Sequence, residues 1–135
     1  IKHQKQEAFY SVSEDFINMP KRQSFKSAEA YYSTLFHELI HSTGHEKRLN
    51  RKSITDMAEF GSEMYSLEEL IAEMGASYLA SMTGILEKGI GNSAAYINGW
   101  LEKLRKDKRF IVYAGAYSQR AVDFILGRKN VTVIS

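Results

Sequence analysis

The pattern of hydrophobic and polar residues is clearest over residues 28–43. Apolar side chains such as Tyr31 and Leu35 recur there at the spacing of a helix with one buried face. Ser27 can cap the first turn, and Gly44 is a natural stop. The pattern therefore predicts a long helix over 28–43.

A second helical pattern follows Ser66. This serine is a good N-cap, and the acids Glu68 and Glu69 stand in the first turn, where the helix dipole favours negative charge. Apolar residues then continue at helical spacing as far as Gly84. We expect a second long helix from Ser66 to just before Gly84, with Glu68 serving only as a charge at its N-terminus.

The remaining segments complete an α+β, mainly helical architecture. Two short apolar and aromatic runs within 8–19 have the form of a β-hairpin, and 45–64 is typical of a loop-rich connection with one helical turn around 54–60. Further helices are predicted over 93–105 and 110–126, the second ending at a glycine. The tail is β-prone.

Composition narrows the chemistry. The chain has 135 residues, 44% hydrophobic and 25% charged, which suits a single folded domain over 1–135. It has no cysteine, which excludes a disulfide scaffold and a thiol nucleophile and assigns any metal to His, Asp or Glu. The net charge of +2 is too mild to require nucleic acid over the whole surface.

Location follows from what the chain lacks. No apolar run approaches the roughly 20 residues that cross a bilayer, and the opening residues have no apolar stretch of a secretory signal. Together with the missing cysteines this predicts a cytoplasmic protein without a membrane partner. The start at Ile1 suggests a fragment excised from a longer protein.

The predicted first helix contains the motif His37-Glu38-Leu39-Ile40-His41. Two histidines four residues apart lie on one helical face and can bind one Zn²⁺. Glu38 lies about one residue further round the helix, toward a water bound to the metal. The metal would activate water, and the carboxylate would take its proton as a general base. The motif predicts metal-dependent hydrolysis, with His37 and His41 as ligands and Glu38 as the catalytic residue.

A catalytic zinc needs a third protein ligand. His45 is nearest in sequence, but on an unbroken helix it lies roughly 12 Å along the axis from His37, unless Gly44 breaks the helix. Glu69 and Glu73 share a face of the second helix, so one can bind the metal while the other accepts a ring N–H from a ligand histidine. The spacing leaves open which of them is the ligand.

Small residues support a close approach of the two helices: Ala72, Gly75 and Ala76 follow directly on these acids. A hydrogen-bond donor for the transition state is also needed, and Tyr113, Tyr117 and His45 are candidates.

Two further features have two interpretations each. The basic stretch 45–52 beside the site is either a contact for an acidic peptide or phosphate backbone, or a solvated loop. We expect Tyr113, Phe124 and other aromatic residues of the C-terminal third to be core residues rather than a stacking platform.

Several segments of this sequence, including the motif at 37–41, resemble the zincin-like metallopeptidase domain of ArdC-type antirestriction proteins. The similarity is carried by the run from Tyr31 to His45, by Arg48-Leu49-Asn50-Arg51, and by Glu68-Glu69-Leu70-Ile71-Ala72-Glu73, and with its flanks covers about 10–127. The resemblance implies a minimal, gluzincin-type fold with a short N-terminal hairpin and about four helices.

The resemblance also implies roles. His37 and His41 would bind Zn²⁺ and Glu38 would be the base. The gluzincin pattern Glu-x-x-x-Asp places the ligand first, which favours Glu69 as the third ligand and Glu73 as the orienting acid, although Asp is commoner at that second position. His45 stays an alternative ligand.

In such proteins an N-terminal single-stranded-DNA-binding domain precedes the peptidase-like part, and the whole protein protects incoming mobile DNA from restriction. The implied function is a zinc metallopeptidase domain that cleaves a peptide or protein substrate, with single-stranded DNA bound through a domain absent here. The alternative is a non-proteolytic, DNA-associated antirestriction module with a structural metal. A third possibility is a metal-stabilised domain that binds a host protein.

Overall fold

The computed structural model describes residues 1–56, 62–85, 98–99, 102, 105 and 109–128. Its elements in chain order are β1 (Phe9–Ser11), β2 (Phe16–Asn18), the 3-10 turn η1 (Arg22–Ser24), α1 (Ala28–Thr43), α2 (Lys52–Thr55), α4 (Ser62–Thr83) and α6 (Arg109–Leu126). The predicted hairpin and three of the predicted long helices are therefore present. The helix predicted over 93–105 and the β-prone tail lie largely or wholly outside the described residues.

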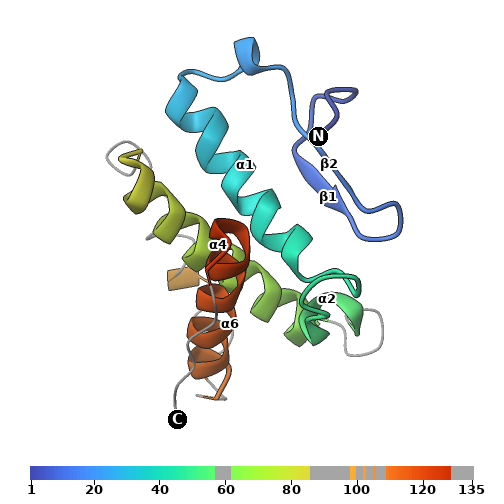
Figure 1. Ribbon diagram of the computed structural model, residues 1–135, viewed down its shortest axis with the longest axis vertical. Coiled ribbons are helices and arrows are strands. Elements are labelled where there is room, and N and C mark those ends of the chain that lie inside the picture. Colours follow the sequence, from blue (N-terminus) through green and yellow to red (C-terminus); the bar gives the residue numbers. More distant parts are fainter. Residues whose placement is uncertain (57–61, 86–97, 100–101, 103–104, 106–108, 129–135) are drawn as a thin grey trace.

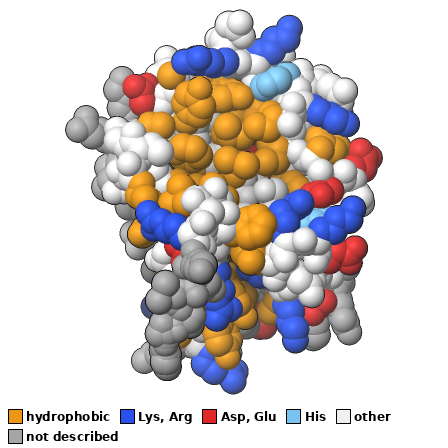
Figure 2. Space-filling view, in the orientation of Figure 1, with side chains coloured by type: hydrophobic (Ala, Val, Ile, Leu, Met, Phe, Trp, Pro, Cys, Tyr) orange, Lys and Arg blue, Asp and Glu red, His pale blue; other side chains and the backbone are white. Residues whose placement is uncertain are grey.

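The hairpin rests on α1 (Figure 1). β1 and β2 are antiparallel, with Tyr10 opposite Ile17, and a turn through Asp15 at φ 54° joins them. The buried Asn18 side chain bonds to the backbone of the preceding N-terminal segment and so holds that segment against β2. On the opposite face of β2, Ile17 and Met19 pack against α1. Figure 2 shows hydrophobic side chains gathered over this part of the molecule.

Helix α1 has the boundaries that its sequence predicts. The Ser27 hydroxyl accepts a hydrogen bond from the Ala30 amide at 3.1 Å, and the helix ends before Gly44. Gly44 has an ordinary φ of −80°, so a left-handed turn is not the reason for glycine here. A Cβ at this position would lie 2.6 Å from Ile54 Cγ1 and 2.9 Å from Arg51 Nη2. Glycine is required because the following loop folds back onto the helix end.

Helix α4 begins four residues earlier than predicted, at Ser62. The prediction of Ser66 as its N-cap is wrong: Ser66 lies within the helix and is 6% exposed. The residues before it are compatible with a helix, with Glu63 in the first turn, so the capping signal at Ser66 is overridden. The predicted C-terminus is confirmed, because Gly84 takes a left-handed φ of 78° after Thr83.

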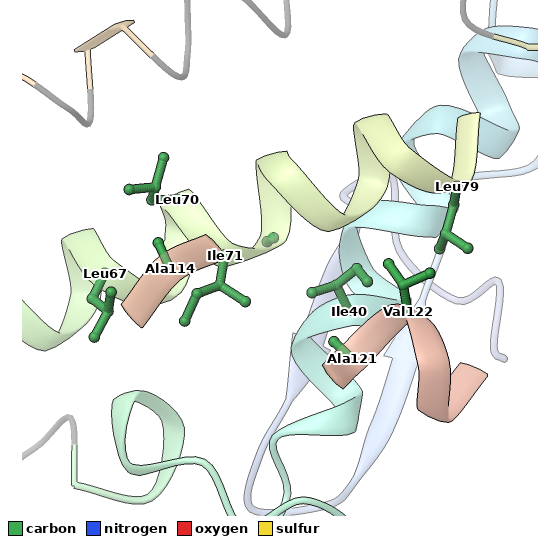
Figure 3. Packing of buried hydrophobic residues seen from close by; sticks show 9 residues of the cluster. Ile40, Leu67, Leu70, Ile71, Leu79, Ala114, Ala121 and Val122 are labelled. Atoms are coloured by element: carbon green, nitrogen blue, oxygen red, sulfur yellow. The ribbon is translucent and has the colours of Figure 1, made fainter. Parts of the chain in front are cut away.

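Helices α1, α4 and α6 enclose the main core (Figures 1 and 3). The buried side chains come from all three helices: Ile40, Leu67, Leu70, Ile71, Ala72, Leu79, Ala114, Ala121 and Val122. The predicted close approach of α1 and α4 is present, since a Cβ at Gly75 would lie 2.6 Å from Ile40 Cδ1. This contact fixes the two helices within a few residues of the HExxH motif and of Glu69.

Two aromatic residues of α6 do not lie in the core as predicted. Tyr113 and Phe124 were expected in the core, but they are 45% and 46% exposed. The helical turn expected around 54–60 overlaps α2, which lies at Lys52–Thr55, and 57–61 lie outside the described residues. No helix of the described part is long and apolar enough to cross a membrane.

Candidate metal centre

Helices α1 and α4 bring three potential metal ligands together. His37 and His41 lie one turn apart on α1, and Glu69 faces them from α4. The Nε2 atoms of the two imidazoles are 3.1 Å apart. Glu69 Oε2 is 3.0 Å from the Nε2 of His37, and Glu69 Oε1 is 3.5 Å from the Nε2 of His41. Within the described residues, the ligand atoms of His37, His41 and Glu69 form a group that all lie within 4.8 Å of one another.

These separations suit a metal ion. Zinc bonds of about 2.0–2.1 Å in a tetrahedral site put neighbouring ligand atoms roughly 3.3 Å apart. The two Nε2 atoms are 3.1 Å apart, and each lies 3.0 or 3.5 Å from one oxygen of the Glu69 carboxylate. Two imidazoles and one carboxylate also form a donor set typical of catalytic zinc. The residues therefore fit a divalent cation, and we refer to His37, His41 and Glu69 as the candidate metal site.

Two further acids orient the imidazoles. The Nδ1 atom of His37 lies 2.8 Å from Glu73 Oε1, and the Nδ1 atom of His41 lies 2.7 Å from Glu68 Oε2. An Nδ1–H that donates to a carboxylate leaves the Nε2 lone pair free for a metal. Glu73 thus occupies the place expected for the acid of the pair that is not a ligand.

The charges around the imidazoles favour a cation. Burial lowers the pKa of His37, but hydrogen bonds to Glu69 and Glu73 outweigh it and raise the pKa to about 10. Burial also lowers the pKa of His41, and the bonds to Glu68 and Glu69 raise it to about 9. With neutral rings, two Nε2 lone pairs would face each other at 3.1 Å. The site is thus suited to surround positive charge, carried by protons or by a metal.

Glu38 lies beside this group and is 8% exposed. Burial raises the pKa of its carboxyl, the positive charge on His37 and His41 lowers it, and the acids Glu69 and Glu73 raise it further, with a net increase. A carboxyl with a raised pKa exchanges protons more readily near neutral pH than an ordinary glutamate does. This environment suits the base that the motif predicts.

Glu68 is the functional residue that the sequence prediction missed. It was assigned only as a charge at a helix N-terminus, and this is wrong: its side chain is 1% exposed and binds His41, Arg51 and Ser53. The error follows from the start of α4. With the helix beginning at Ser62, Glu68 stands in the second turn, beyond the reach of the helix N-terminus. The sequence signal that could have identified Glu68 was its position directly before Glu69, the candidate ligand.

The other candidates from the sequence are His45, Tyr113 and Tyr117. His45 is buried, but its Nδ1 accepts the Lys47 amide at 3.1 Å, and it is not part of the converging group. Tyr117 packs against the main core and makes a ring contact with Tyr113. A role of any of these three as transition-state donor stays a prediction.

The basic stretch 45–52 is largely occupied by contacts within the chain. Arg48 pairs with Asp15 of the hairpin turn, and Arg51 pairs with Glu68. Lys47 and Lys52 remain exposed. This supports the interpretation as a structured loop over that of a basic surface for phosphates. The sequence has a second basic group, most of which lies outside the described residues: Lys103, Arg105, Lys106, Lys108 and Arg109.

A model of the zincin-like metallopeptidase family matches residues 1–117, which is most of the chain. The chain therefore belongs to the zincin-like metallopeptidase family. Among solved structures it is similar to the antirestriction protein ArdC from the R388 plasmid. The Mn(II)-bound form matches with 39% identity and a TM-score of 0.74 over 91% of this chain and 44% of ArdC. The metal-free form matches with 38% identity and a TM-score of 0.73 over 90% of this chain and 43% of ArdC.

Curated relatives include two proteins named DNA primase TraC from Escherichia coli. They are 42% and 39% identical over 120 residues, 88% of this chain but 11% and 8% of the primases. The protein y4eC of Sinorhizobium fredii (strain NBRC 101917 / NGR234) is 34% identical over 131 residues, 96% of this chain and 41% of that protein. The chain thus spans less than half the length of each relative.

The comparison with ArdC confirms the resemblance and the mainly helical fold with an N-terminal hairpin. One of the two ArdC structures contains bound Mn(II). The agreement between that finding and the candidate metal site is the basis for a functional proposal.

Proposed function

We propose that this chain is a zinc-dependent peptidase domain, with His37, His41 and Glu69 as metal ligands and Glu38 as the general base. The observation that carries the proposal is the convergence of two Nε2 atoms and one carboxylate within 3.0–3.5 Å of one another. Membership of the zincin-like metallopeptidase family supports it.

Each residue has a defined task in this proposal. A bound Zn²⁺ would polarise the peptide carbonyl and lower the pKa of water. Glu38 would accept a proton from the attacking water and deliver it to the amine released when the C–N bond breaks. Glu73 and Glu68 would keep the imidazoles in the tautomer that turns Nε2 inward. The products are a free carboxylate and a free amine.

The test separates metal binding from catalysis. Glu38→Gln removes the base but no ligand, so it should retain zinc while hydrolysis of a fluorescently labelled, unfolded casein falls by about 100- to 10,000-fold. His41→Ala removes a ligand, so it should lose both zinc and hydrolysis. Elemental analysis and the casein assay are run on the same preparations. Full activity of Glu38→Gln would exclude Glu38 as the base.

We also propose that the domain works within an antirestriction protein, since its match to ArdC covers nine-tenths of this chain. Binding of single-stranded DNA would be a property of the full-length protein, as the family resemblance implies, and Arg48 and Arg51 of this chain are engaged in internal ion pairs. Protection of transferred plasmid DNA from restriction is the readout. If protection persists in full-length protein with Glu38→Gln, the metal has a structural role and peptide hydrolysis is dispensable.

A further inference from the structure

A buried arginine connects the loop after α1 to the candidate metal site. Arg51 is 4% exposed, and its Nε and Nη2 atoms donate to the two oxygens of Glu68 at 2.8 and 2.9 Å. This is the paired geometry in which a guanidinium binds a carboxylate most strongly. The same side chain donates to Thr43 Oγ1 at 2.9 Å and to the Ile40 carbonyl at 3.0 Å, both on α1.

These contacts leave Glu68 no freedom to rotate. Its Oε1 accepts from Arg51 Nε and from the Ser53 hydroxyl at 2.7 Å. Its Oε2 accepts from Arg51 Nη2 and from His41 Nδ1 at 2.7 Å. Each carboxylate oxygen therefore has two donors, and three of the four donors are supplied by Arg51 and Ser53. The fourth is an imidazole of the candidate metal site.

Stability alone does not account for this arrangement. A buried ion pair contributes little net stability, and well-packed apolar residues of similar size often replace it without loss. What apolar residues cannot supply is a fixed acceptor for the Nδ1–H of His41. That hydrogen bond sets which ring nitrogen faces Glu69 and His37.

We infer that Arg51 is a positioning residue for the metal site: by clamping Glu68 it holds the His41 ring with Nε2 directed at the metal position. The inference rests on the proposed metal-binding function of that site. The hydrogen bonds of Arg51 go to Glu68, Thr43 and Ile40, so it acts on His41 through Glu68. Gly44 makes room for it, because a Cβ there would lie 2.9 Å from Arg51 Nη2.

The chain offers a matched control in Arg48. It lies in the same loop and is also ion-paired, but its contacts go to Asp15, Tyr10 and the Ser42 carbonyl. Loss of Arg48 should therefore disturb the loop without releasing His41. Arg51→Met and Arg48→Met remove the same chemical group from the same loop.

The experiment measures zinc affinity by competition with a chromophoric chelator, and folding stability of the metal-free proteins by urea. We expect Arg51→Met to weaken zinc binding by about 10- to 100-fold, and Arg48→Met to stay within about twofold of wild type. Arg51→Lys keeps the charge but loses the paired geometry, so it should fall between them. It also decides the question if Arg51→Met does not fold.

A double variant distinguishes positioning from packing. Arg51→Met combined with Glu68→Met replaces the pair by apolar side chains and should recover folding stability relative to Arg51→Met alone. Under the inference, zinc affinity stays low in the double variant because the acceptor for His41 is still missing. Recovery of affinity together with stability would overturn it.

The outcomes for the two proposals are separable. If wild type binds zinc and folded Arg51→Met or Arg51→Lys binds it equally well, the positioning role is wrong and the proposed function is untouched. If wild type binds no zinc, the proposed metal site fails, and the role of Arg51 in it fails as well.

Discussion

Glu69 and Glu73 are chemically identical and lie one helical turn apart, yet they face different atoms of the same imidazole. Glu69 Oε2 approaches the Nε2 of His37, and Glu73 Oε1 approaches its Nδ1. A metal bound at Nε2 of His37 would lie beside Glu69, while Glu73 lies at the other ring nitrogen. The two acids should therefore contribute unequally to metal binding.

We predict that Glu69→Ala loses zinc outright, while Glu73→Ala retains the site with affinity reduced by about 10- to 100-fold. Elemental analysis of proteins purified without chelators or added metal gives the stoichiometry, and titration with zinc gives the affinity. Glu63→Ala, an exposed acid of the same helix, is the control and should keep wild-type affinity. Equal loss in Glu69→Ala and Glu73→Ala would contradict the division of roles.

The site residues of α1 were predictable because their spacing is helix geometry: histidines four apart must share a face wherever the helix lies. The orienting acid Glu68 was not. Its role depends on Arg51, which is 17 residues away in sequence, and on the position of a helix start that local signals misplaced. Contacts of this kind depend on tertiary packing, which a local pattern does not encode.

At the scale of elements, α1 and α4 meet through Gly75 and Ile40. A Cβ on Gly75 would lie 2.6 Å from Ile40 Cδ1 and 2.9 Å from Cγ1, and Ile40 is fully buried. The helices would have to separate slightly, or Ile40 leave its rotamer. The candidate metal site depends on the same helix spacing.

We expect Gly75→Ala to destabilise the fold by about 1–3 kcal/mol through overpacking, opposed by up to about 1 kcal/mol of helix propensity, and to weaken zinc binding as the helices part. Gly115→Ala on α6 is the matched control, since its Cβ would meet only Met74 Cε at 4.0 Å. It should leave zinc affinity unchanged and be neutral or stabilising. Urea unfolding and zinc titration check both variants, and tighter zinc binding by Gly75→Ala would refute the argument.

Elements bounded by glycine were the most predictable. Helices α4 and α6 end before Gly84 and Gly127, both at positive φ, where other residues would be strained. The start of α4 was less predictable because Ser66 has two roles open to it, as a cap or as a small residue inside a helix. Burial of Ser66 decides between them, and burial is a property of the assembled helices.

At the scale of the whole molecule, the hairpin packs along α1. Its packing against Tyr31 and Leu35 is apolar, and polar contacts of the hairpin turn add to it. Asp15 in the hairpin turn accepts hydrogen bonds from Tyr10 and Arg48, and Arg48 also donates to the Ser42 carbonyl. The turn, the helix end and the loop that carries Arg51 are thereby held together. Asp15 and Arg48 are 33 residues apart, so the sequence alone gave no sign of the pair.

This contact makes a definite prediction for pH dependence. Hydrogen bonds from Arg48 and Tyr10 hold the pKa of Asp15 below its ordinary value of 3.8. A group whose pKa is lowered by folding contributes stability above its unfolded pKa and loses it as pH falls through the folded pKa. Asp15→Asn should therefore cost about 0.5–1 kcal/mol at pH 7, as expected for a partly exposed pair. That difference should persist to about pH 5 and then shrink as the pH falls below the ordinary pKa.

Asparagine suits this test because it tolerates the left-handed φ of 54° at this position. Urea midpoints of wild type and Asp15→Asn between pH 7 and pH 3 give the difference directly. Glu14→Gln removes the neighbouring exposed charge and controls for net charge. If the gap between wild type and Asp15→Asn stays constant or widens towards pH 3, the carboxylate of Asp15 is not what fastens the hairpin. The apolar contacts with α1 would then hold it without help from the ion pair.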